Sequence, residues 1–227
     1  MKRIIIILML ILLGGALFAQ HSAGNLMAGA EFGFGLNLIG EQDALIGNPT
    51  SIGLSYLGGL NFDYYIFSAL SVSTGVAYRG TVNSVSYEIS TRLSEEAFFH
   101  RGYLRIPVSV HANILFLWLG GGFAYNVILF ENYEARERDF SSVIYRERIT
   151  GYRSNNYSEL FFDVGFDFSA NNPNNSGSRL FARITPAMST TSPRSEHINI
   201  FSRDVRSLDI ALILQMSGTV GRFPIFK

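Results

Sequence analysis

The chain of 227 residues carries 18 basic and 18 acidic side chains and no cysteine. The lack of cysteine excludes disulfides, thiolate metal sites and a cysteine nucleophile, and the balanced charge gives no footprint for nucleic acid. The length suits a single domain, because an all-β closed structure of this size need not divide further.

The first twenty residues predict a secretory signal peptide. Lys2 and Arg3 precede an apolar run that reaches Phe18 and is followed by the small residue Ala19. The run is too short for a spanning helix, which needs about 20 apolar residues, and its order of charge, apolar stretch and small residue is that of an export signal. We expect residues 1–20 to be a cleaved signal peptide, with a short membrane anchor as the alternative, and residues 21–227 to form the barrel domain described below.

Alternation of apolar with small or polar residues begins at Leu26 and recurs along the chain. In the segment LMAGAEFGFGLNL, residues 26–38, every second side chain is apolar. A period of two residues is that of a strand with two different faces. The same period marks residues 52–66, 70–82, 104–112, 115–129, 160–168, 180–188 and 208–216. The sequence therefore predicts eight strands.

The connections between these strands alternate in length. Short links at residues 67–69 and 113–114 and a turn-rich link at residues 169–178 alternate with long polar segments. The long segments are residues 39–51, 83–103, 130–157 and 189–207. Outer-membrane barrels have short periplasmic turns and longer external loops. We therefore predict an all-β fold, an eight-stranded antiparallel up-and-down transmembrane β-barrel, in the bacterial outer membrane.

Charged residues inside the predicted strands all lie opposite the apolar face. A sheet in lipid must close on itself to pair its backbone, and an Arg or Lys facing lipid at the midplane costs about 2 to 4 kcal/mol. The apolar face is thus predicted to face lipid and the charges to fill a closed, polar-plugged lumen, with a proton or ion path as the alternative. The predicted lumen charge network consists of Glu31, Asp63, Arg79, Arg105, Asp163, Arg183 and Asp209, with Asp167 on the same parity.

Two ion pairs are predicted within this network, because an unpaired buried charge is costly. Glu31 is expected to pair with Arg79 or Arg105, and Asp163 with Arg183 on the next strand.

Aromatic side chains are expected to form belts at the two membrane interfaces. The belt residues are Phe62, Tyr64, Phe67, Phe116 and Trp118 at the short turns, and Tyr78, Tyr125 and Phe130 toward the long loops.

Four segments resemble one bacterial family. Gly59, Asn61 and Phe62, LSVSTGVAYRG at residues 70–80, YLRIPVSV at residues 103–110 and LGGGFAY at residues 119–125 resemble the outer-membrane β-barrel domain of the PorT type. The resemblance spans most of residues 26–216 and implies a small barrel, with some members linked to secretion or envelope maintenance. Arg105 stands where the family would have an acidic residue. The ending SGTVGRFPIFK leaves open whether Phe223 or Phe226 belongs to the assembly signal.

The loops offer candidate recognition residues and weak candidates for catalysis. The third long loop mixes Tyr with Arg, a combination enriched in recognition surfaces, although a solvated loop or a hairpin formed by VIYRERITGY, residues 143–152, is equally consistent. The candidates there are Tyr133, Tyr145, Arg146, Arg148, Tyr152 and Arg153.

A hydrolase would need Ser or Thr, His and an acid together. Ser195, Glu196 and His197, or His100 near Glu95 and Glu96, match only in composition.

These patterns predict a non-enzymatic outer-membrane protein with a structural or surface-interaction role through four external loops. A small solute channel is the alternative, followed by a lipid-modifying enzyme, and a soluble lipocalin-like barrel is the structural rival. The expected partners are outer-membrane lipid, the barrel-assembly machinery and an extracellular ligand or protein, with no nucleic acid. No metal-ligand spacing or phosphate-binding glycine loop occurs, so we expect no cofactor and no metal.

Overall fold

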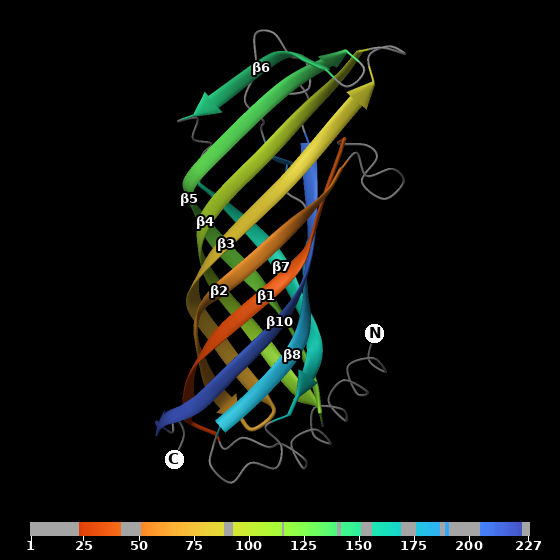
Figure 1. Ribbon diagram of the computed structural model, residues 1–227. Helices are drawn as coiled ribbons and strands as arrows, with labels where there is room; N and C mark the ends of the chain where they lie inside the picture. The colour runs from red at the N-terminus through yellow and green to blue at the C-terminus, as the bar shows by residue number, and fades with distance from the viewer. Residues whose placement is uncertain are drawn as a thin grey trace.

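The computed structural model describes residues 23–41, 51–88, 93–114, 116–139, 142–150, 156–168, 176–186, 189–190 and 205–223. The predicted signal peptide, residues 1–20, lies outside these residues. No helix within them is long and apolar enough to cross a membrane. The described residues form strands that pair into one sheet (Figure 1).

Eight of the strands close into a ring. They are β1 (Asn25–Glu41), β2 (Ser51–Phe67), β3 (Leu70–Glu88), β4 (Leu93–Ile114), β5 (Leu117–Asp139), β7 (Tyr157–Asp167), β8 (Ser176–Thr185) and β10 (Val205–Arg222). Each pairs antiparallel with the next, and β1 pairs with both β2 and β10, so the ring has no open edge. The predicted eight-stranded up-and-down barrel is confirmed.

One side of the barrel rises above the rest as an extended sheet. β3, β4 and β5 continue past the barrel, and β6 (Ser142–Thr150) pairs with β5 at their far end (Figure 1). The prediction that residues 83–103 and 130–157 are long loops is therefore wrong for most of their length. Their backbone groups continue the ladder of the strands below them, and the proposed hairpin near residues 143–152 is present as β5 and β6. We call this part, from β3 to β6, the raised sheet. The remaining strand, β9 (Ser189–Thr190), is a short addition beside β10.

The two faces of the barrel are sorted as the alternation predicts. Outward side chains are apolar and exposed, among them Phe34 at 77%, Leu54 at 64% and Leu212 at 58%. All eight charged residues of the predicted strands are buried inside. A soluble barrel would show the opposite arrangement, because burial of apolar surface is what drives folding in water. The lipocalin-like alternative is thus disfavoured by the burial pattern itself.

The belt prediction holds for some aromatic residues and fails for one. Phe62, Phe67 and Phe116 are exposed near the short turns, as expected. Trp118 is only 1% exposed and lies inside the barrel. It stacks on His111 with ring centroids 3.9 Å apart, because its position continues the inward parity of β5. Trp118 is therefore part of the lumen core, not of an interfacial belt.

Close approach of neighbouring strands requires glycine at several inward positions. At Gly122 an added Cβ would overlap the carbonyl oxygen of Val108 and the Cα of Ser109 on β4. We expect Gly122→Val to lower the free energy of unfolding by about 1–3 kcal/mol, since backbone must move to relieve the overlap. Gly218→Val is the matched control, because nothing lies within 4 Å of a Cβ there. Equal unfolding midpoints in denaturant for the two variants would contradict the prediction.

Candidate functional site

The lumen of the barrel contains a chain of buried ion pairs, and its lowest cluster is centred on Arg179. The Arg179 guanidinium donates to Asp63 at 2.6 Å, to Asp167 at 3.0 Å and to the hydroxyl of Tyr65. It also lies 5.3 Å from the Trp118 ring. Arg179 is not among the predicted lumen charges because the predicted strand begins at residue 180, whereas β8 begins at Ser176.

The middle cluster confirms one predicted pair and corrects the other. Arg183 donates to both carboxylate oxygens of Asp163, at 2.8 and 2.9 Å, as the register between β7 and β8 predicts. The cationic partner of Glu31 is also Arg183, at 3.8 Å. The prediction that Arg79 or Arg105 pairs with Glu31 is wrong, because both of these arginines bind Glu159 instead.

Glu159 organises the upper cluster. It accepts hydrogen bonds from Arg79 at 3.0 Å and from Arg105 at 2.9 Å. Arg79 reaches on to Asp209 at 2.9 Å, and Asp209 accepts a hydrogen bond from Asn37 at 3.3 Å. Glu159 is not among the predicted lumen charges because it lies one residue before the predicted strand start, although it shares the inward parity of Asp163 in β7.

A single aromatic ring separates the middle and upper clusters. The guanidinium carbons of Arg105 and Arg183 each lie 4.5 Å from the centroid of the Phe161 ring. Cation–π contacts of this kind attract the two cations to the ring faces. Side chains thereby fill most of the lumen, as an eight-stranded barrel allows.

The predicted recognition residue Tyr133 belongs to this interior. Its hydroxyl accepts a hydrogen bond from Arg101 at 3.0 Å and donates one to Glu131 at 3.2 Å. A bulge explains the position: Tyr103 pairs with Ile128, whereas Gly102 pairs with Phe130. The residue left over shifts the parity of β5, so that Tyr133 and Glu131 point inward. Tyr133 is therefore not available on the outer surface.

The lumen also contains a serine, a histidine and an aspartate in contact. His111 lies 3.0 Å from the Ser73 hydroxyl through Nδ1 and 3.3 Å from Asp163 through Nε2. In a hydrolase the imidazole takes the serine proton. Here the Ser73 hydroxyl donates to Asp63 and must accept from His111. The three side chains are buried, and their arrangement joins the lower cluster to the middle one without activating the serine.

Some of the remaining catalytic and recognition candidates lie outside the described residues, and the others are exposed on described strands. Ser195, Glu196, His197, Tyr152 and Arg153 lie outside the described residues, as does the side chain of Tyr145. His100 is exposed and lies 3.5 Å from the hydroxyl of Tyr56. Arg146 and Arg148 are exposed on β6. Among the described residues, no group of three or more His, Cys, Asp or Glu is placed to hold a metal ion.

Two cavities interrupt the filled lumen near its outer end. The larger, of about 20 Å³, has room for about one water molecule and is lined by Arg79, Arg101, Tyr103, Glu159 and Asp209, among others. The smaller, of about 10 Å³, lies against Arg105 and Arg183 as well as Arg79. Both are walled by side chains that already hold ion pairs. Most of the charged side chains in these walls already belong to the ion-pair network, although Nη1 and Nη2 of Arg105 and Nη1 of Arg183 have no hydrogen-bond partner among the described residues.

Comparisons with known proteins found bacterial outer-membrane proteins among solved structures. They include Ail, the attachment invasion locus protein of Yersinia pestis, at 13% identity over 85% of this chain and 99% of that chain with a TM-score of 0.38. OprG from Pseudomonas aeruginosa has 11% identity over 89% of this chain and 98% of that chain, with a TM-score of 0.42. The outer membrane protease OmpT from Escherichia coli has 9% identity over 86% of this chain and 96% of that chain, with a TM-score of 0.34. Because these TM-scores are low, the barrel fold rests on the strand pairing of this chain itself.

No family model matches the chain, and no curated protein matches it either. The resemblance to the PorT type therefore remains a prediction that rests on short motifs.

Proposed function

We propose that this protein is an integral protein of the bacterial outer membrane with a sealed lumen, serving a structural or surface-interaction role through its raised sheet and external loops. One observation carries the proposal: the barrel is apolar outside and charged inside. Thirteen of the buried residues are acids, arginines or histidine, while the exposed outward face of the barrel is built from Phe, Leu, Ile and Val. Such a surface suits the hydrocarbon core of a membrane.

The filled lumen favours this role over transport of solutes. Arg79, Arg105 and Arg179 each bind an acid on a strand that is not their neighbour, so they tie separate parts of the barrel wall together, whereas Arg183 binds Asp163 on the adjacent strand. Opening a path for a solute would require breaking several buried pairs, and removing one partner of such a pair typically costs about 3–5 kcal/mol. The external surface is then the part of the molecule available to partners.

Heat-modifiability of the refolded chain tests the proposal. The mature chain in detergent micelles is expected to give a faster-migrating gel band when unboiled than when boiled, with a β-rich circular dichroism spectrum. Folding in plain buffer without a change in mobility would contradict membrane insertion.

Conductance across planar bilayers then tests the sealed lumen. Bilayers that contain the folded barrel are expected to show no stepwise conductance above that of bilayers treated with detergent alone. Discrete conductance steps would contradict the sealed lumen and favour the solute channel, while leaving the membrane location intact.

A further inference from the structure

The outward face of the raised sheet carries a grid of side chains just above the apolar belt. Strand register places these side chains in rows across β3 to β6. From the barrel upward, the rows are Val82, His100 and Asn132; then Phe98, Glu134 and Arg148; then Glu96, Arg136 and Arg146. The grid thus changes from a mixed row without a carboxylate or an arginine to two rows that carry both.

Arginines exceed acids on this face, and one arginine has no acid of its own. Glu134 accepts from Arg146 at 2.8 Å and from Arg136 at 2.5 Å, and these hydrogen bonds hold the pKa of Glu134 below its usual range, Arg146 having the larger effect. Arg148 lies opposite Glu134 in register, but it makes no ion pair within the part of the chain that the structure describes. Among the side chains that the structure describes on this face, with Glu96 included, there are three arginines and two acids, so their excess charge is positive.

Arg148 lines an open pocket whose other walls are mixed in character. The pocket has a volume of about 160 Å³ and is bounded by Val82, Phe98, His100, Asn132 and Glu134 together with Arg148. The guanidinium of Arg148, the Asn132 amide and the His100 ring supply hydrogen-bond donors, and guanidinium groups bind phosphate with two parallel bonds. The pocket therefore has the polar groups that an anionic oxygen ligand requires.

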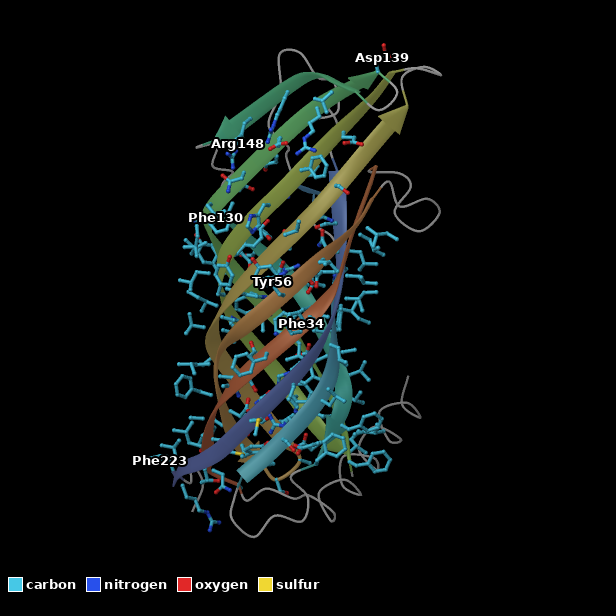
Figure 2. The ribbon with its side chains drawn as sticks, viewed as in Figure 1. Phe34, Tyr56, Phe130, Asp139, Arg148 and Phe223 are labelled. Atoms are coloured by element: carbon cyan, nitrogen blue, oxygen red, sulfur yellow. The ribbon has the colours of Figure 1, made fainter. Side chains whose placement is uncertain are left out.

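The lower wall of the pocket continues into the lipid-facing surface. His100 packs against Phe130 with ring centroids 5.0 Å apart and approaches the hydroxyl of Tyr56. Figure 2 shows Arg148 above Phe130, with Tyr56 lower still on the barrel. Val82, at 43% exposed, joins the pocket to this apolar face. A ligand in the pocket would thus have its charged part at Arg148 and an apolar part directed down the barrel wall.

We propose that this pocket binds the phosphorylated headgroup of a lipid in the surrounding leaflet, with Arg148 as the phosphate ligand. His100 and Asn132 donate hydrogen bonds to the headgroup, and the acyl chains lie along Val82 and Phe130. Charge complementarity selects the phosphate, and continuity with the apolar belt selects a lipid over a soluble anion. The inference rests on the membrane location proposed above.

Binding of a phosphorylated glycolipid to the folded barrel tests this site. The probe is lipid A with both phosphates, titrated into the barrel in uncharged detergent and followed by native mass spectrometry, with lipid A stripped of phosphate for comparison. We expect Arg148→Gln to weaken binding of the phosphorylated lipid about tenfold, as expected for loss of a charge-assisted hydrogen bond. Arg148→Lys should recover part of the affinity, because it restores the charge but not the planar fork.

Arg222→Gln is the matched control, since Arg222 is an exposed arginine in the last residues of β10, away from the pocket. It is expected to bind like the unmodified barrel. Equal affinity of the Arg148→Gln variant and the unmodified barrel, or equal affinity for the two forms of lipid A, would overturn the site. Competition by inorganic phosphate at the concentration of the lipid would also overturn it in favour of a soluble anion.

The same gels separate this proposal from the one on which it rests. If every variant keeps the heat-modifiable band and lipid binding ignores Arg148, only the lipid site fails. If the unmodified chain gives no such band and folds without detergent, the membrane location fails and the lipid site fails with it.

Discussion

Replacing Arg179 by methionine is expected to lower the free energy of unfolding by about 3–5 kcal/mol. Methionine keeps the unbranched stem of arginine but removes the charge that Asp63 and Asp167 share. Both carboxylates would stay buried, at 1% exposure each, after losing the guanidinium that binds them. The loss can be measured by denaturant unfolding of the barrel in lipid, followed by the mobility of the unboiled band and by the fluorescence of Trp118, the one tryptophan of the chain.

Two further variants separate loss of the ion pairs from loss of packing. Arg222→Gln removes an exposed arginine and is expected to change the free energy of unfolding by less than about 1 kcal/mol. Combining Arg179→Met with Asp63→Asn and Asp167→Asn also removes the two carboxylate charges, so the triple variant should recover part of the free energy of unfolding. A triple variant no more stable than Arg179→Met alone would show that the guanidinium acts by filling space and not by its charge.

The two-residue period of the strands predicts most of the charged residues in the lumen. It does not predict those that lie at the ends of the strands. Inward acids such as Glu31 and Asp163 stand out because apolar neighbours flank them on both sides. Glu159 and Arg179 follow the same parity, yet each is the last polar residue before an apolar run and cannot be distinguished from a turn residue by pattern alone. Extending each strand by one or two residues along its parity would have found both.

Two other features depend on information that the alternation does not contain. The bulge between Tyr103 and Gly102 shifts the parity of β5 by one residue, so no periodic pattern places Glu131 and Tyr133 inside. The raised sheet has polar residues on both faces, because above a membrane neither face needs to be apolar. Its strands were therefore predicted as loops, although their backbone ladder continues from the barrel past the bulge at Gly102.

Replacing Phe34 by arginine is the substitution that discriminates best between a membrane barrel and a water-soluble one. Phe34 is 77% exposed, so in water the change would remove exposed apolar surface and leave stability nearly unaltered. In a bilayer the guanidinium would face hydrocarbon, and the cost at the midplane is about 2–4 kcal/mol. Figure 2 places Phe34 on the barrel wall between Phe223 at one rim and Phe130 toward the other, which is where this cost is largest. We therefore expect Phe34→Arg to lower the free energy of unfolding, measured by denaturant titration in lipid vesicles, by an amount in that range.

The control for this result is the same substitution at a position closer to the membrane interface. Phe223 is also an exposed phenylalanine, at 61%, but it directly follows the end of β10 at the rim. Phe223→Arg should therefore cost only about 0–1 kcal/mol, because near the interface the guanidinium reaches water and headgroups. Phe34→Leu accounts for loss of the ring without adding a charge. If Phe34→Arg proves as stable as Phe34→Leu, the apolar face does not contact lipid, and its exposed side chains must be covered by protein instead.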